Sequence, residues 1–241
     1  MKNTPIQTIK AITIDLDDTL WPIWPAIDRA EAHLHEWMKE KAPATAAATT
    51  VNTLRELRNQ VEQQHPEWKH DLSAYRREAI RLALIQNGDD AALAEEGFHI
   101  FFQMRQQVDF FDDAIPALEY LSTHYPVVAV SNGNANLEQI GISQYFTASV
   151  SAQNFGIAKP DARIFHEAAR LTGINDIQSQ EILHIGDDYR LDIAGARNAG
   201  LQAAWLVRPD ITDTSHTAIP CEMAPQYQVQ NLLELCQALA G

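Results

Sequence analysis

The sequence predicts an α/β fold: a doubly wound, parallel, Rossmann-like sheet with an inserted α-helical bundle. Two observations predict it. Downstream of residue 112, short apolar strands alternate with helical segments, which is typical of a parallel sheet. Residues 24–107 instead carry apolar side chains at helical spacing and show no strand pattern. Because an apolar strand precedes this helical block, we expect the block to interrupt the sheet domain after its first strand.

The individual elements follow from hydrophobic periodicity and from turn residues between the apolar segments. The first is the apolar run 9–14, which has the length of a buried strand. Four helices with short connections, which predict a bundle, are expected at residues 26–41, 51–64, 72–86 and 91–108. The remaining strands are expected at residues 127–130, 148–150, 182–185 and 203–207, and the remaining helices at residues 114–124, 135–140, 162–172 and 191–199.

These elements divide the chain into two predicted domains. Residues 1–22 and 109–241 form an α/β core domain with the catalytic site, and residues 23–108 form a helical cap domain. An insertion after the first strand starts at the carboxyl edge of the sheet, where open α/β sheets bind their ligands. We therefore expect the cap domain to cover the site and to select the substrate.

Composition and charge exclude several classes of function. The 241 residues carry a formal net charge of −14, which repels nucleic-acid backbones and anionic lipid surfaces, so we expect no nucleic-acid and no membrane partner. The two cysteines, Cys221 and Cys236, form neither a zinc-binding spacing nor a disulfide framework. No apolar run approaches the roughly 18 residues of a membrane span, and residues 1–10 do not resemble a signal peptide. We expect a soluble cytoplasmic protein, and the sequence leaves its oligomeric state open.

An acidic cluster directly follows the first predicted strand. Asp15, Asp17 and Asp18 place three carboxylates within four positions, with no lysine or arginine among them. Like charges at this spacing raise one another's pKa unless a cation lies between them. The cluster therefore predicts a metal ion, and its position at the end of the strand suits Asp15 to act as a nucleophile.

Three further polar groups follow or adjoin other strands of the same predicted sheet. Ser131 and Asn132 end the strand 127–130, Lys159 lies a short loop after the strand 148–150, and Asp187 follows the strand 182–185. The carboxyl ends of parallel strands meet at one edge of the sheet. We therefore expect a hydroxyl, a lysine and two acidic clusters to surround one cleft.

Four motifs in this order resemble those of the haloacid dehalogenase-like hydrolase superfamily with a helical cap. They are D-x-D-x-T at residues 15–19, S-N-G at 131–133, K-P at 159–160 and G-D-D-x-x-x-D at 186–192. The cap lies between the first and second motifs. With the segment His70–Arg76, the chain also resembles the bacterial phosphatases that act on flavin mononucleotide and on the riboflavin-pathway intermediate 5-amino-6-(5-phosphoribitylamino)uracil.

The resemblance implies a role for each catalytic residue, and phosphoryl-transfer chemistry explains the residue types. Asp15 attacks phosphorus and forms an aspartyl-phosphate, while Asp17 protonates the leaving group and then activates water. Ser131 donates a hydrogen bond to a phosphoryl oxygen, and Lys159 balances the negative charge of nucleophile and phosphate. The implied cofactor is Mg²⁺, a hard cation held by Asp15, Asp187 and the backbone carbonyl of Asp17.

The predicted substrate contacts combine this edge of the sheet with the start of the helical block. They are Ser131, Asn132, Lys159, Trp21 and Arg76. The indole of Trp21 has two alternative roles, to stack on a planar substrate or to pack beside Pro22, whereas packing is expected for Trp24.

Three residues near the fourth motif have alternative interpretations. Asp188 and Asp192 either contact the metal directly or support its ligands, and Asp192 suits equally the first turn of the helix 191–199. His184 lies inside an apolar run, which favours a core histidine over a metal ligand.

The predicted function is a Mg²⁺-dependent phosphatase acting on a small phosphorylated metabolite, with flavin mononucleotide or a riboflavin-pathway phosphate as the narrower hypothesis. The alternative is a phosphomutase of the β-phosphoglucomutase type, which also retains the aspartate at position 17. A dehalogenase needs no leaving-group acid, so Asp17 argues against it. A non-catalytic binding protein with this fold should have lost at least one of Asp15, Asp17, Lys159 and Asp187, and all four are present.

Overall fold

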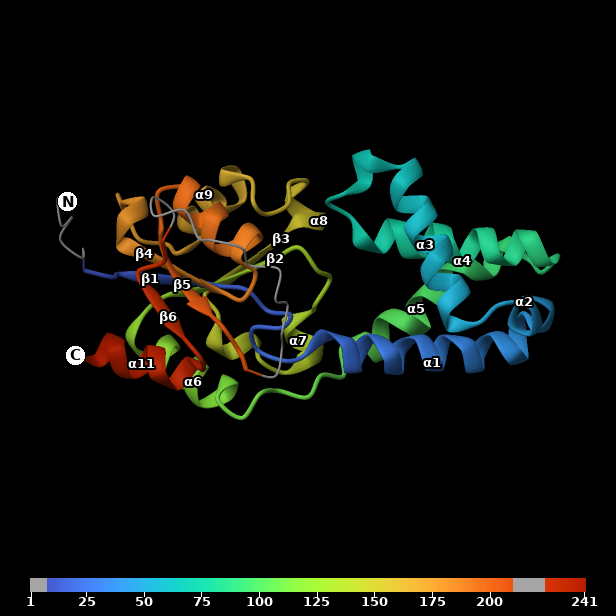
Figure 1. Ribbon diagram of the computed structural model, residues 1–241, viewed down its shortest axis with the longest axis horizontal. Helices are drawn as coiled ribbons and strands as arrows, with labels where there is room; N and C mark the ends of the chain where they lie inside the picture. Colours follow the sequence, from blue (N-terminus) through green and yellow to red (C-terminus); the bar gives the residue numbers. More distant parts are fainter. Residues whose placement is uncertain (1–7, 210–223) are drawn as a thin grey trace. The chain divides into compact units, whose positions relative to one another are not determined.

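The computed structural model describes residues 8–209 and 224–241, and the chain divides into two compact units. The sheet unit comprises Met1–Pro22, Phe110–Asn132 and Gly141–Gly241 (Figure 1). The helical unit comprises Ile23–Asp109 and Gly133–Ile140. The segment Gly133–Ile140, which the sequence assigned to the core domain, therefore belongs to the helical unit.

Six strands of the described chain form one parallel sheet in the order β3-β2-β1-β4-β5-β6. Their bounds are β1 Ala11–Ile14, β2 Val127–Ser131, β3 Ala148–Ser151, β4 Ile182–Gly186, β5 Gln202–Leu206 and β6 Tyr227–Val229. β1 lies between β2 and β4, so the strand order changes direction beside it. This is the point at which doubly wound sheets bind ligands, and the predicted fold class is confirmed.

The central strand β1 is buried along its whole length because both of its edges are paired. Ile14 pairs with Ala129 of β2 on one side and with Ile185 of β4 on the other. The next residue, Asp15, is therefore level with the carboxyl ends of both neighbours. This register brings the first, second and fourth motifs to one edge.

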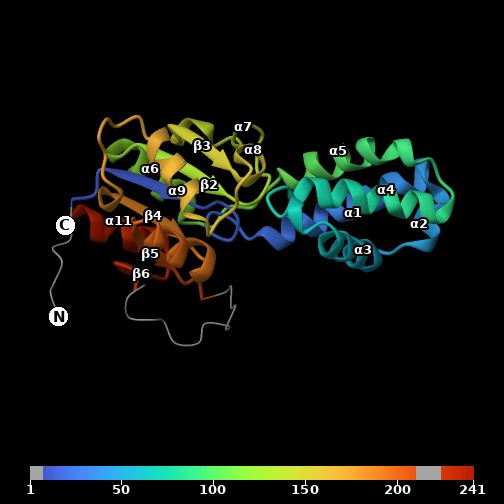
Figure 2. The ribbon, with the colours of Figure 1, turned by 90° about the horizontal axis from the view of Figure 1, so that it is seen from above.

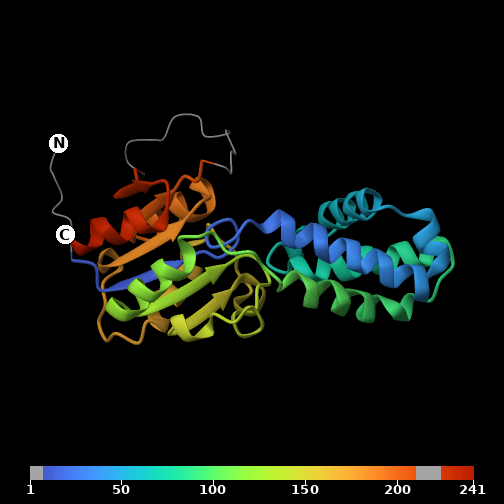
Figure 3. The same ribbon diagram turned by 90° about the horizontal axis from the view of Figure 1, so that it is seen from below.

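Helices cover both faces of the sheet. α9 (Ala162–Leu171) and α10 (Gly195–Asn198) lie on one face, where Phe165 and Ala196 pack in a core with residues of β2, β3 and β5. α6 (Ala114–His124) and α11 (Leu232–Ala240) pack together on the other face (Figure 3). The shorter segments of the sheet unit are α8 Ala152–Phe155, the 3₁₀ turns Ser143–Tyr145 and Ser179–Glu181, and the π-helical segment Tyr189–Ala194.

The helical unit has a core of its own. α1 packs along α5, and α4 packs against both α3 and α5 (Figure 2). Apolar residues on the inner faces of these helices form the core, among them Leu34, Met38, Ile80, Leu84 and Phe101. The helices are α1 Ile23–Lys41, α2 Pro43–Ala48, α3 Val51–Gln64, α4 Leu72–Asn87, α5 Ala94–Arg105 and α7 Leu137–Ile140, with 3₁₀ turns at Pro66–Trp68 and Ala91–Leu93.

Some predicted elements differ from the observed ones for local reasons. The connection after α1 contains α2, because Pro43 occupies the first helical turn, where its missing N–H costs nothing. The predicted helix 191–199 is a π-helical segment followed by α10. β6 and α11 were not predicted. No helix among the described residues is long and apolar enough to cross a bilayer. Cys236 is a buried free thiol, and Cys221 lies outside the described residues.

Candidate active site

Asp15 and Lys159 form a buried ion pair at the carboxyl end of β1. The Asp15 backbone N–H donates to the carbonyl of Ile185 at 2.9 Å, which continues the pairing of β1 with β4. Its Oδ1 lies 2.5 Å from the Lys159 Nζ, and the same ammonium lies 2.6 Å from Asp192 Oδ1. Burial lowers the pKa of Lys159, but the two carboxylates outweigh it and raise that pKa above its ordinary value. Lys159 is therefore charged.

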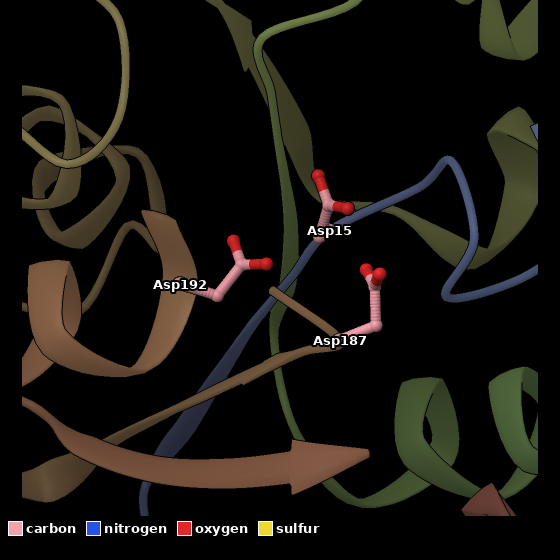
Figure 4. A group of neighbouring side chains, drawn as sticks. All are labelled: Asp15, Asp187 and Asp192. Atoms are coloured by element: carbon pink, nitrogen blue, oxygen red, sulfur yellow. The ribbon is translucent and has the colours of Figure 1, made fainter. Parts of the chain in front are cut away.

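Three carboxylates from three segments meet beside this lysine. Asp15 follows β1, Asp187 follows β4 and Asp192 lies in the π-helical segment, and one oxygen from each lies within 4.8 Å of the others (Figure 4). Burial, followed by repulsion from Asp192 and Asp18, raises the pKa of Asp187 to about 7. Burial and the neighbouring carboxylates Asp192 and Asp187 likewise raise the pKa of Asp15, against the opposing effect of Lys159.

The charges in this group do not balance, and a divalent cation fits the imbalance. Three carboxylates face one ammonium, which leaves two negative charges in a largely buried space when all groups are ionised. Carboxylate oxygens are the ligands that Mg²⁺ prefers. Asp192 already accepts several hydrogen bonds, so Asp15 and Asp187 are the carboxylates suited to hold the ion.

Trp21 contacts the predicted acid–base residue. The turn after β1 uses Asp18 in the left-handed region at φ 59°, a conformation that aspartate tolerates better than most residues. The indole Nε1–H of Trp21 donates to Asp17 Oδ1 at 2.9 Å, and the ring packs edge-on against Phe110. Trp21 is fully buried. The indole therefore packs within the sheet unit, and its predicted contact with substrate stays a prediction. Trp24, expected to pack, is 60% exposed.

The second motif holds the lysine in place through the main chain. Ser131, the last residue of β2, is buried at the same edge of the sheet. The Asn132 side chain donates from Nδ2 to the Lys159 carbonyl at 3.1 Å, and its Oδ1 accepts from the Lys159 N–H at 2.8 Å. Both ends of this amide are thus bound to the backbone of Lys159. The contacts of Ser131 and Asn132 with substrate stay predictions.

Hydrogen bonds show how Asp188 and Asp192 of the fourth motif are held, while their predicted roles toward a metal stay predictions. Asp188 Oδ1 accepts from the N–H groups of Arg190 and Leu191, so Asp188 caps the π-helical segment. Asp192 Oδ2 accepts from the Asp188 N–H at 3.1 Å, while its Oδ1 binds Lys159. The hydroxyl of Thr19 donates to Asp187 Oδ1 at 3.0 Å, a contact that the sequence pattern did not predict.

Arg76 lies within the helical unit and forms an internal ion pair there. Its Nη1 donates to Glu31 Oε1 at 2.9 Å, and its guanidinium lies 3.8 Å from the centre of the Phe101 ring. Burial lowers the pKa of Arg76 to about 10, with Glu31 acting in the opposite direction. Its predicted contact with substrate stays a prediction.

A family model for haloacid dehalogenase-like hydrolases matches residues 9–200. The chain belongs to this family. The predicted resemblance is confirmed, and so is the prediction of a hydrolytic enzyme.

Relatives within the haloacid dehalogenase-like hydrolases include enzymes with different named activities. The 5-amino-6-(5-phospho-D-ribitylamino)uracil phosphatase YigB of Escherichia coli is 32% identical over 235 residues, which is 96% of each chain. The pyrimidine 5'-nucleotidase YjjG of the same organism is 31% identical and aligns with 52% of this chain and 55% of its own. A crystal structure of a 2-haloacid dehalogenase from Pseudomonas syringae is 36% identical, with a TM-score of 0.83 over 97% of this chain and 99% of that one.

The bond from Trp21 to Asp17 leads to a testable prediction. Trp21→Phe keeps an aromatic ring but removes the N–H that orients the carboxylate, and we expect kcat to fall about tenfold, as for the loss of one positioning hydrogen bond. Trp37→Phe is the matched control, because it removes an indole bond to Glu96 in the helical unit. Steady-state kinetics with p-nitrophenyl phosphate measure both variants. Equal kcat values for the two would contradict the prediction.

Proposed function

We propose that this protein is a Mg²⁺-dependent phosphatase that hydrolyses a small phosphorylated metabolite through an aspartyl-phosphate. The observation that carries the proposal is the arrangement of Asp15, which lies beside Lys159 and Asp187, with a second aspartate two positions along the chain at Asp17. A carboxylate in that position can act as nucleophile, and the ammonium can balance a phosphoryl group. The match to YigB over nearly the full chain supports the phosphatase class.

In the proposed reaction, Asp15 is the nucleophile and Asp17 is the general acid and base. One oxygen of Asp15 attacks phosphorus, the bond from phosphorus to the ester oxygen breaks, and Asp17 gives its proton to the departing alkoxide. Asp17, now a carboxylate, takes a proton from water as the water attacks the aspartyl-phosphate and releases phosphate. Lys159 remains charged, and the hydroxyl of Ser131 donates to a phosphoryl oxygen. Mg²⁺, held by Asp15 and Asp187, would neutralise charge on the phosphoryl oxygens.

The dehalogenase alternative is disfavoured by one residue. A 2-haloacid dehalogenase expels a halide, which needs no proton, so an acid at position 17 has no task in that reaction. Here the Asp17 carboxylate is held by the Trp21 indole, as a positioned acid–base group should be. This bond favours a reaction with an alkoxide leaving group, even though one solved relative is described as a dehalogenase.

The match to YigB supports a proposal for the substrate class. The substrate of YigB is a phosphorylated ribityl chain carrying an aminouracil, and we propose a substrate of this type, with flavin mononucleotide as a second candidate. Selection by the helical unit and by Arg76 forms part of this proposal. A phosphomutase remains the alternative activity.

One screen separates these functions. The purified protein with Mg²⁺ is incubated with 5-amino-6-(5-phosphoribitylamino)uracil, flavin mononucleotide, β-glucose 1-phosphate and 2-chloropropionate. Released phosphate, glucose 6-phosphate and chloride are measured. We expect phosphate release, fastest from the ribityl phosphates. Chloride release without phosphate release would overturn the proposed function, and accumulation of glucose 6-phosphate would identify a mutase.

Metal affinity should depend on pH because Mg²⁺ competes with protons for the same carboxylates. With the pKa of Asp187 at about 7 in the absence of metal, this group is protonated below pH 7 and ionised above it. For the Asp187 proton, we expect the Mg²⁺ association constant from calorimetry to rise with a slope that approaches about tenfold per pH unit well below pH 7 and levels off above it. Asp187→Asn should remove this contribution to the slope, whereas the exposed control Asp176→Asn should keep it. An association constant independent of pH would contradict this assignment.

A further inference from the structure

A buried chain of hydrogen bonds runs from the core of the sheet to the active-site lysine. His184 in β4 and Thr13 in β1 are neighbours in the strand register, and both side chains are fully buried. The Thr13 hydroxyl lies 2.9 Å from His184 Nδ1, and His184 Nε2 lies 3.1 Å from Asp192 Oδ1. Because that Asp192 oxygen also binds Lys159, a continuous path connects Thr13 with the lysine beside Asp15.

The partners of His184 determine where its proton lies. Lys159 and His184 lower the pKa of Asp192 to about 2 against the effect of burial, so Asp192 is a carboxylate that only accepts hydrogen bonds. Nε2 must therefore carry the hydrogen. Burial lowers the pKa of His184, which favours the neutral ring, so Nδ1 has no hydrogen and accepts from the Thr13 hydroxyl. The Asp192 carboxylate thus specifies the tautomer, and the Thr13 hydroxyl, which can donate to Nδ1, is compatible with it.

Packing also fixes the ring and the carboxylate it holds. The Phe165 ring meets the His184 ring edge-on, with centroids 4.9 Å apart and an interplanar angle of 88°. Asp192 lies directly against Gly186, where an added Cβ would stand 2.3 Å from the Asp192 Cγ. Gly186 therefore leaves the space that Asp192 fills. Rotation of either side chain would break bonds or collide with its neighbours.

From these contacts we infer that His184 is a positioning residue of the reaction, in addition to its place in the core. It holds the Asp192 carboxylate in the orientation that directs Lys159 toward Asp15, and the Thr13 hydroxyl holds the other nitrogen of the imidazole. Without the Nε2–H bond, Asp192 keeps the Asp188 N–H but loses the contact that orients its Oδ1, so the ammonium is directed less precisely toward the nucleophile. This inference rests on the proposed function for its kinetic consequence, whereas its structural content is independent of any activity.

The structural part is tested on the unmodified protein by NMR. Long-range ¹⁵N–¹H spectra at pH 7 are expected to show His184 as the neutral tautomer with hydrogen on Nε2, and Lys159 as a protected ammonium. A hydrogen on Nδ1 instead, or an unprotected Lys159 amine, would overturn the inference. Because this measurement needs neither substrate nor variant, it remains decisive if a variant does not fold or if the phosphatase assignment fails.

The kinetic part uses a pair of substitutions at one position. His184→Gln retains an N–H donor close to the position of Nε2, whereas His184→Leu removes it. We expect kcat for p-nitrophenyl phosphate to fall about 10–100-fold in His184→Leu, the usual effect of losing a residue that orients a site group, with KM changed less than threefold. His184→Gln should recover most of the loss, and Thr13→Val should reduce kcat less than His184→Leu does.

A control histidine separates this role from general destabilisation. His166 in α9 bonds the Ala199 carbonyl in the same unit, and His166→Leu should leave kcat unchanged. A kcat of His184→Leu within twofold of the unmodified protein, or equal losses in His184→Gln and His184→Leu at similar melting temperatures, would overturn the positioning role. If the unmodified protein hydrolyses no phosphate ester, the proposed function has failed, and the NMR result alone decides the inference.

Discussion

Asp15→Asn is expected to abolish phosphatase activity, with a loss of at least about 1,000-fold in kcat, because an amide oxygen is a poor nucleophile and the covalent step is lost. The substitution changes little in shape, and it leaves Lys159 bonded to Asp192. The folded state should therefore survive, and circular dichroism should match that of the unmodified protein. Steady-state kinetics with p-nitrophenyl phosphate, and acid quenching to detect phosphoprotein, measure the result.

Asp18→Asn is the matched control for this loss. It makes the same chemical change three positions along the chain, and asparagine accepts the left-handed conformation at φ 59° that Asp18 adopts. We expect this control to retain at least about a tenth of the activity, since Asp18 acts on Asp187 only through its charge in the proposed mechanism. Turnover by Asp15→Asn at a similar level would exclude Asp15 as the nucleophile.

Asp17→Asn is expected to produce the second largest effect, and the effect should depend on the leaving group. Proton transfer from a positioned acid contributes about 10²–10⁴-fold, so hydrolysis of an alkyl phosphate should slow by that factor. p-Nitrophenolate leaves without a proton, so the first step with p-nitrophenyl phosphate should remain fast. Hydrolysis of the aspartyl-phosphate should still be slow, because the amide in this variant cannot take a proton from water.

Rapid mixing of Asp17→Asn with p-nitrophenyl phosphate tests this division of labour. We expect a burst of about one p-nitrophenolate per active site, followed by slow turnover, and a phosphoprotein that can be trapped with acid. The unmodified protein provides the control, with rapid turnover and little trapped phosphoprotein. Normal steady turnover of alkyl phosphates by Asp17→Asn would show that another group serves as the acid.

The elements that the sequence predicted are those with strong local signals. Apolar runs of strand length and the change to helical spacing at residue 24 identified the sheet and the inserted helices. Three of the four motifs stand at strand ends, so the parallel topology alone brought Asp15, Ser131 and Asp187 to one edge. Weak local signals were missed or misread. The Ala-rich segment at Pro43 was interpreted as a connection, and β6 has only three residues.

The sequence predicted where polar side chains lie in the fold better than it predicted which groups they contact. Asp192 had two alternative roles in the sequence, and its bonds to Lys159 and His184 become visible only when three distant segments pack together. Trp21 follows the first motif and could equally have met a substrate. Its buried ring packs against Phe110, which lies beyond the whole helical insertion in the sequence.

The sequence by itself indicated the hydrolase family of this protein, through an acidic pair at the end of a strand, a lysine, a hydroxyl and a third acidic group in an order typical of that family. Only the tertiary structure decided how these groups are held. The local sequence around a histidine in an apolar strand is the same whether or not its ring forms hydrogen bonds. Here the ring of His184 bonds with Thr13, which lies 171 positions away in the sequence. Hydrogen bonds between such distant residues depend on strand register and packing, which hydrophobic periodicity does not specify.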